Sequence, residues 1–144
     1  MSHITRYSLM PIPPIEAHTH WFEAGNLRIG VEYRLLNDAI AAAAQLEAAN
    51  GNVPGVEANG PIDDRGVSLH VVARQDGEDR ELLRFDCFQE DPHYHYVSWR
   101  AKSNEMIHLD PVADGDPLTW ALDRLRARLL PMLIRAGATD AVSY

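Results

Sequence analysis

Alternation of apolar and polar residues predicts β-strands along much of the chain, because side chains two positions apart in a strand share one face. Residues 26–35 alternate in this way. Their apolar face carries Leu27, Ile29, Val31, Tyr33 and Leu35, and their polar face carries Arg28, Glu32 and Arg34. Residues 18–23 precede them across Ala24 and Gly25, so the two segments are predicted to form a half-buried hairpin.

Further segments of this kind follow, and short turn sequences separate them. They are residues 67–74, 80–88, 93–100 and 104–110. Strands joined by connections this short pair antiparallel, so the segments predict a meander.

The C-terminal region has a helical pattern instead. Asp116 and Pro117 are typical of a helix start, and Gly137 is typical of a helix end. Between them, apolar residues at helical spacing predict one long helix, whose stripe contributes more core than any other element. The stripe consists of Leu118, Ala121, Leu122, Leu125, Leu129, Met132 and Leu133. Pro131 lies within it and is expected to kink the last turns.

These elements define an α+β fold: a single domain, residues 1–144, with a curved antiparallel sheet of about six strands packed on the long C-terminal helix. An extended N-terminal arm, residues 1–15, either packs on this domain or reaches a second subunit, which would make the protein a homodimer. An alanine-rich helix is predicted at residues 39–49. The long loop at residues 51–66 either covers a site or is disordered.

Composition narrows the classes of function. The formal net charge of −8 argues against broad electrostatic binding to nucleic acid. Cys87 is the only cysteine, so an intramolecular disulfide and a four-cysteine zinc site are excluded. No apolar run approaches the roughly 18 residues of a membrane helix, and the N-terminus does not resemble a secretion signal, so a cytoplasmic protein is expected.

Several polar side chains are predicted to share the sheet face opposite the helix, where cross-strand neighbours lie about 5 Å apart. They are His70, Arg84, Asp86 and His108. The segment 93–100 turns either its histidine pair or its tyrosine pair to this face. The concentration of His and Tyr indicates a pocket for a small-molecule ligand; the alternative is a face left to water.

In such a pocket, four residues are candidate catalytic acids or bases. They are Asp86, His95, His70 and His108. Arg84 would anchor an anionic group, although Arg84 and Asp86 equally predict a plain ion pair. Tyr94 and Tyr96 would bind substrate through their hydroxyls, or would only cover neighbouring strands. Cys87 lies beside an acid and between phenylalanines, so its pKa is expected to be raised and a nucleophilic role is disfavoured.

Two His-x-His pairs indicate a metal site, because this spacing points two imidazoles the same way from one strand and suits zinc or iron. The pairs are His93 with His95, and His18 with His20. On neighbouring strands they would supply three or four ligands. The alternative is that these are surface or hydrogen-bonded core histidines.

A row of arginines lies on the C-terminal helix. Its members are Arg124, Arg126, Arg128 and Arg135. The row would contact nucleic acid or an acidic partner. The commoner situation is the solvated back of an amphipathic helix, with Asp123 pairing locally.

Four runs resemble a small family of bacterial domains of unknown function, over most of the chain from Trp21 onward. They are Arg84–Phe88, Asp91–Tyr96, His108–Asp110 and Gly115–Trp120. The resemblance implies no activity. Residues 80–95 are also similar to small toxins of the TumE type, without a matching catalytic residue.

The leading hypothesis is a small cytoplasmic enzyme or ligand-binding protein that acts on a small polar or aromatic organic molecule. Acid–base chemistry by His and Asp would make it a lyase, hydrolase or isomerase, and a bound zinc or iron ion is a variant. The rival is an interaction protein, such as a toxin–antitoxin component, that uses the arginine row and the proline-containing arm.

Overall fold

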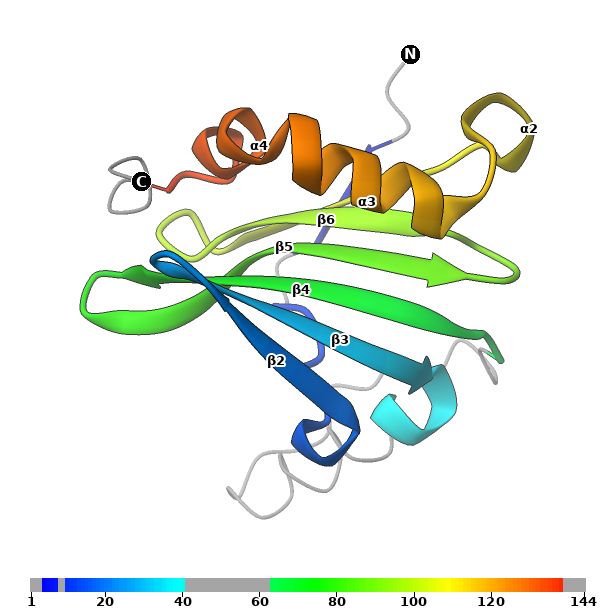
Figure 1. The fold of residues 1–144 in the computed structure, drawn as a ribbon, viewed down its shortest axis with the longest axis horizontal. Helices are drawn as coiled ribbons and strands as arrows, with labels where there is room; N and C mark the ends of the chain where they lie inside the picture. Colours follow the sequence, from blue (N-terminus) through cyan, green and yellow to red (C-terminus); the bar gives the residue numbers. More distant parts are fainter. Residues whose placement is uncertain (1–3, 8–9, 41–62, 139–144) are drawn as a thin grey trace.

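The computed structural model describes residues 4–7, 10–40 and 63–138. These residues form a seven-stranded antiparallel sheet in the order β1-β7-β6-β5-β4-β3-β2, with helices on one face (Figure 1). The strands are β1 (Ile4–Tyr7), β2 (Thr19–Ala24), β3 (Leu27–Leu35), β4 (Arg65–Gln75), β5 (Glu78–Phe88), β6 (His93–Ser98) and β7 (Ser103–His108). The α+β class and the meander are confirmed.

The sheet has one strand more than predicted, because part of the N-terminal arm is itself a strand. Residues of β1 pair with β7, from Ile4 opposite Ile107 to Tyr7 opposite Asn104. This arm segment covers an edge that the meander would otherwise leave unpaired.

The prediction of one long C-terminal helix is wrong. In its described C-terminal region, residues 109–138, the structure has three short helices, α2 (Pro111–Asp114), α3 (Pro117–Ala127) and α4 (Leu129–Arg135). Arg128 separates α3 from α4 with φ −131° and ψ 13°. Pro131 explains the break, because its ring clashes with the carbonyl of Ala127 in a continuous helix, whereas a proline in the first turn of α4 costs no helical hydrogen bond.

The apolar core lies between the sheet and α3 and α4. It includes Leu69, Val71, Leu83, Phe85, Ala121, Met132 and Leu133. Asp116 caps α3, since its carboxylate accepts a hydrogen bond from the backbone N–H of Thr119 at 2.9 Å. The apolar stripe of the C-terminal region therefore faces the sheet as predicted, apart from Leu122, which is exposed.

The other face of the sheet is covered by the N-terminal arm. β1 and β2 lie at opposite edges, so the chain between them crosses the sheet. We call residues 10–15, which contain three prolines, the strap. Arg34 donates hydrogen bonds to the carbonyl oxygens of Ile12 and Pro13, at 3.0 and 3.2 Å. The strap's extended backbone leaves such carbonyls without internal partners.

The strap reverses the expected burial of β3. Glu32 and Arg34, predicted to lie on an outer polar face, are 0% and 2% exposed, whereas Tyr33 from the predicted apolar face is 54% exposed. The helices lie over β5 and β6 and leave this end of β3 uncovered (Figure 1). The burial of a strand residue therefore depends on which part of the chain covers its face of the sheet, and not only on whether the residue is polar.

Two predicted segments lie mainly outside the described residues. Of the helix predicted at 39–49, residues 39 and 40 are described and belong to a helical stretch that begins at residue 36. Of the loop predicted at 51–66, residues 65 and 66 already belong to β4. Within the described part of the chain, no helix is long and apolar enough to span a membrane.

Candidate metal centre

Asp86, His93 and His95 converge on the strap-covered face of the sheet. Asp86 lies on β5 and is paired in register with His93 on β6. Because side chains alternate along β6, His93 and His95 point to this face and Tyr94 points to the other. Tyr94 packs on the helical side, 5.0 Å from the Trp120 ring. Of the two orientations left open for this strand, the structure has the one that places the histidines beside Asp86.

The three side chains meet at one carboxylate oxygen. Nε2 of His93 lies 3.0 Å from Oδ2 of Asp86, and Nε2 of His95 lies 3.2 Å from the same oxygen. One ligand atom from each residue lies within 4.8 Å of the others. All three residues are buried. This arrangement can hold a metal ion with two nitrogen ligands and one oxygen ligand.

Neighbouring groups orient each of these side chains. Ser68 donates a hydrogen bond of 2.6 Å to Oδ1 of Asp86, which leaves Oδ2 facing the histidines. Nδ1 of His93 donates to the backbone carbonyl oxygen of Asp91 at 2.8 Å, because a carbonyl oxygen only accepts. Nδ1 of His95 lies 2.8 Å from Oδ1 of Asn104 and donates to it. Supporting hydrogen bonds of this kind fix the tautomer of metal-ligating histidines.

The environment keeps the carboxylate charged and treats the two histidines differently. Burial alone raises the pKa of Asp86, but the hydrogen bond and positive charge of His93, together with the positive charge of Arg84, outweigh it and hold that pKa well below its usual value. Burial alone lowers the pKa of His93, but Asp86 raises it above the usual value. At His95 burial dominates and lowers the pKa. Since Nδ1 of neutral His95 carries its proton, Nε2 presents a lone pair to Asp86.

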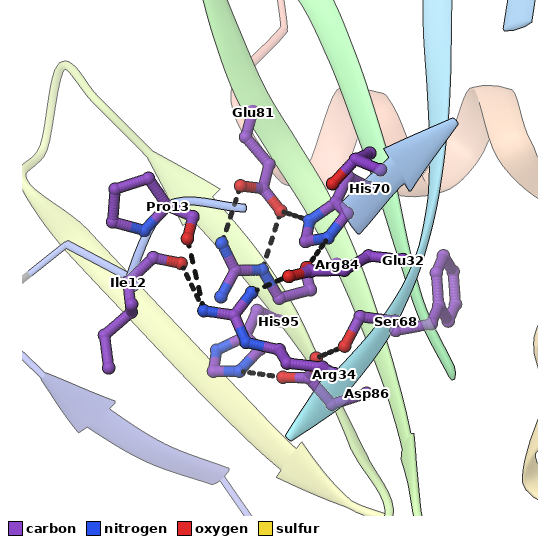
Figure 2. Close-up of polar contacts among 12 residues, drawn as sticks. Ile12, Pro13, Glu32, Arg34, Ser68, His70, Glu81, Arg84, Asp86 and His95 are labelled. Carbon is purple, nitrogen blue, oxygen red and sulfur yellow. Dashed lines mark hydrogen bonds and ion pairs between the residues drawn. The ribbon is translucent and has the colours of Figure 1, made fainter. Parts of the chain in front are cut away.

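A second buried cluster lies beside this centre (Figure 2). Nδ1 of His70 lies 2.7 Å from Glu81, and Nε2 lies 2.8 Å from Glu32. Arg84 donates two hydrogen bonds to Glu81, at 2.7 and 2.8 Å. Arg34 donates to Glu32 at 3.1 Å. We call these five residues the ion-pair network.

The hydrogen bonds and opposite charges in this network shift the pKa values of its members so that the charged forms are favoured. Burial opposes ionisation of Glu81, but Arg84 and His70 lower its pKa to about 2. Burial likewise lowers the pKa of His70, but hydrogen bonds to Glu32 and Glu81 raise it above its usual value. His70 is therefore a cation held between two carboxylates.

A β-bulge brings Glu81 into the network. Val71 pairs with Leu83 and Val72 pairs with Glu81, so Leu82 has no partner on β4. The extra residue shifts the alternation and turns Glu81 to the same face as Arg84. Without the bulge, Glu81 would point towards the helices.

The structure divides the predicted site residues among different places. Asp86, His93 and His95 come together, whereas His70 belongs to the ion-pair network. The expected ion pair of Arg84 is present, but its hydrogen-bonded carboxylate is Glu81 rather than Asp86. His108 hydrogen-bonds the exposed Asp91 side chain.

The remaining predicted residues lie away from the centre. His18 and His20 are exposed at the β2 edge, and β3, β4 and β5 separate them from β6, so they do not complete a site with His93 and His95. Tyr94 and Tyr96 lie on the helical face, close to each other. Burial raises the pKa of Cys87 to about 12, in agreement with the expectation that this thiol is not activated.

Sequence reasoning did not assign functional roles to several residues that support these clusters. They are Glu32, Ser68, Glu81 and Asn104. Alternation does place Ser68 on the polar face, but it carries no information about its partner. For Glu81 the signal is the pair Leu82-Leu83, which interrupts the alternation and is typical of a bulge.

Fold and site together define an α+β domain with a candidate centre of two histidines and one carboxylate. The chain belongs to the family described as a domain of unknown function, DUF7700, whose model matches residues 21–144. No curated protein and no solved structure matches the chain. The resemblance to a family of unknown function is confirmed, and the likeness to TumE-type toxins stays an expectation.

Proposed function

We propose that this protein binds one divalent transition-metal ion, zinc or iron(II), through Asp86, His93 and His95. A single observation carries the proposal: the Nε2 atoms of two imidazoles converge on one oxygen of a charged carboxylate. Hydrogen bonds at Nδ1 orient both imidazoles. Without a cation between them, the lone pair of His95 Nε2 faces the negative charge of Asp86 at 3.2 Å. A metal ion converts this repulsion into two coordinate bonds.

The spacing of the donor atoms supports the proposal. Around an ion with ligand distances of about 2.0–2.2 Å, neighbouring ligand atoms lie about 2.9–3.5 Å apart, depending on the coordination geometry. The Nε2–Oδ2 distances of 3.0 and 3.2 Å fall in this range. All three ligand atoms lie within 4.8 Å of one another.

The donor types favour particular metals. Imidazole nitrogen suits zinc and iron, whereas calcium and magnesium prefer sites made of oxygen. Three protein ligands also leave a coordination position for water or substrate, as in catalytic rather than structural zinc sites. A bound ion would supply a Lewis acid at this position. We infer that the activity, if enzymatic, is metal-dependent hydrolysis, elimination or isomerisation of a small polar molecule.

The ion-pair network does not support a direct substrate-binding role for Arg84. Both its Nε and one terminal nitrogen are engaged by Glu81. Releasing Arg84 to a substrate would leave Glu81 buried with fewer charge partners, which is costly. We assign the network a structural role that rigidifies the sheet beside the metal centre.

The test is metal titration of chelator-treated protein, followed by calorimetry and thermal unfolding. We expect one zinc or anaerobic iron(II) ion per chain, and at 100 times the dissociation constant a gain of about 2.7 kcal/mol in the free energy of unfolding. Magnesium should give no such gain. His95→Ala or Asp86→Asn should weaken binding by about 100-fold or more, because the first removes a ligand and the second removes the negative charge of a ligand.

The matched control is His20→Ala, which also removes one imidazole but from the exposed β2 edge. It should leave the affinity unchanged. Absence of stoichiometric binding to the unaltered protein, or equal losses in the His95 and His20 variants, would contradict the proposal.

A further inference from the structure

A polar cavity lies on the face of the sheet opposite the candidate metal centre, between β6 and the helices α3 and α4. Its volume is about 290 Å³. Its lining consists of Tyr94, Tyr96, Trp120, Arg124, Arg128, Pro131, Met132 and Arg135. Because β6 alternates, the tyrosines face this cavity while His93 and His95 face the metal centre. The cavity is therefore independent of the proposed metal site.

The arginine row divides between this cavity and solvent. Arg126 points outward and pairs with Asp123 at 3.1 Å. Arg124, Arg128 and Arg135 instead line the cavity. Arg135 pairs with Glu105 at 3.1 Å and lies over the Tyr96 ring, 4.0 Å from its centroid.

Arg124 and Arg128 carry positive charge at the cavity without a carboxylate partner among the described residues. The Arg124 guanidinium lies over Trp120, 5.0 Å from the ring centroid. Its Nε is buried and has no hydrogen-bond acceptor within the described part of the chain. A buried donor without an acceptor costs free energy, and no carboxylate of the described residues neutralises this guanidinium.

Aromatic groups line the cavity beside these arginines. Tyr94 and Tyr96 have ring centroids 5.6 Å apart, and Trp120 lies against Tyr94. The cavity thus offers guanidinium donors beside flat apolar surface.

We propose that this cavity binds a small organic anion, in which a carboxylate or phosphate is attached to a planar ring. Arg124 and Arg128 bind the anionic group, and the ring lies against Tyr94 and Trp120. The volume is at the lower end for small-molecule sites, which fits a ligand of one ring and one anionic group. A long polyanion such as nucleic acid is disfavoured, because the formal net charge of −8 repels it outside this local patch.

The test is calorimetric titration with three probes: phenyl phosphate, inorganic phosphate and phenol. We expect phenyl phosphate to bind at least tenfold more tightly than either fragment, since it alone engages both the arginines and the aromatic groups. Equal affinity for phenyl phosphate and inorganic phosphate would overturn the ring part of the proposal. No binding of phenyl phosphate, together with binding of a single-stranded oligonucleotide, would overturn the choice of a small ligand.

Variants then locate the site. Arg124→Gln and Arg128→Gln should each weaken phenyl phosphate binding at least tenfold, and Arg124→Lys should restore only part of the affinity because it keeps the charge but not the Nε donor. The matched control is Arg126→Gln, which removes the same charge from the solvent side of α3. Equal losses in the 124 and 126 variants would show diffuse charge attraction and overturn the proposal.

Failure here is distinguishable from failure of the metal proposal. His95→Ala should leave phenyl phosphate binding unchanged, because the sheet separates the two sites. Circular dichroism and thermal unfolding of each variant show whether it is folded before binding is measured.

Discussion

Two buried histidine clusters share one face of the sheet and differ in their ratio of bases to acids. His70 is one imidazole between two carboxylates, and each carboxylate also receives an arginine. Asp86 is one carboxylate between two imidazoles. The first ratio closes an ion-pair network within the protein. The second leaves the Nε2 lone pair of neutral His95 directed at the anion that His93 also contacts, an arrangement that could hold a metal ion.

The comparison teaches that burial of histidine and acid does not by itself indicate function. The two clusters differ in whether each hydrogen-bonding atom already has a partner, a donor facing an acceptor or a cation facing an anion. Removing a member of the network should therefore damage folding, and removing a member of the metal centre should mainly damage metal binding.

The largest effect is expected from Glu81→Gln. This change leaves the charges of Arg84 and His70 buried with one carboxylate fewer, so the free energy of unfolding should fall by about 3–5 kcal/mol. Urea unfolding measures it. Glu78→Gln is the control, since exposed Glu78 pairs with Arg80 on the same strand and should cost less than about 1 kcal/mol. A similar small cost for both variants would contradict the assignment of Glu81 to a closed network.

A smaller effect is expected from Asn104→Ala, which removes the group that orients His95 without removing a ligand. Zinc affinity should fall by about 10- to 100-fold. His20→Ala is again the control, because His20 is exposed on β2, which β3, β4 and β5 separate from β6. If Asn104→Ala binds zinc as well as the unaltered protein does, the supporting role of Asn104 is wrong.

The smallest effect is the pH dependence of the metal-free protein. The pKa of His70 is raised from 6.5, so its stabilisation is complete below about pH 6.5 and is lost as the pH rises through the folded-state pKa. The pKa of Glu81 is lowered from 4.5 to about 2, so its stabilisation is present above about pH 4.5 and is lost as the pH falls towards 2.

Urea midpoints of metal-free protein should therefore be highest between about pH 4.5 and 6.5. His93 titrates in the same direction as His70, so a His70→Gln variant isolates the part due to His70. Its profile above pH 6.5 should be flatter than that of the unaltered protein. An unchanged slope would show that His70 is not charged in the folded state.

The strands were largely predictable and the candidate metal centre was partly predictable, because both depend on short-range spacing. His18 and His20, rather than Asp86, were expected to complete a metal site with His93 and His95. Alternation placed Asp86 on the polar face, and the spacing of His93 and His95 pointed both imidazoles the same way. The orientation of β6 was open in the sequence. It is decided by Tyr94, whose ring packs against Phe85 and Trp120 on the helical side.

Other features were not predictable, because they depend on segments far apart in the chain. Glu32 lies 38 residues from His70, and Ser68 lies 18 residues from Asp86. The strand order separates His20 from His95, although the pair His18 and His20 has the same spacing in the sequence as the pair His93 and His95. The cavity at Arg124 is lined from both sides of the helix break, by Arg124 on α3 and by Pro131 and Met132 on α4.

The sequence by itself determined the α+β class, the faces of most strands and the pairing of His93 with His95, because neighbours along a strand or helix have fixed relative directions. Only the tertiary structure decided that the polar face is buried, since the strap that covers it comes from the opposite edge of the sheet. It also decided that Glu81 joins Arg84, because one unpaired residue in β5 changes the direction of every side chain before it.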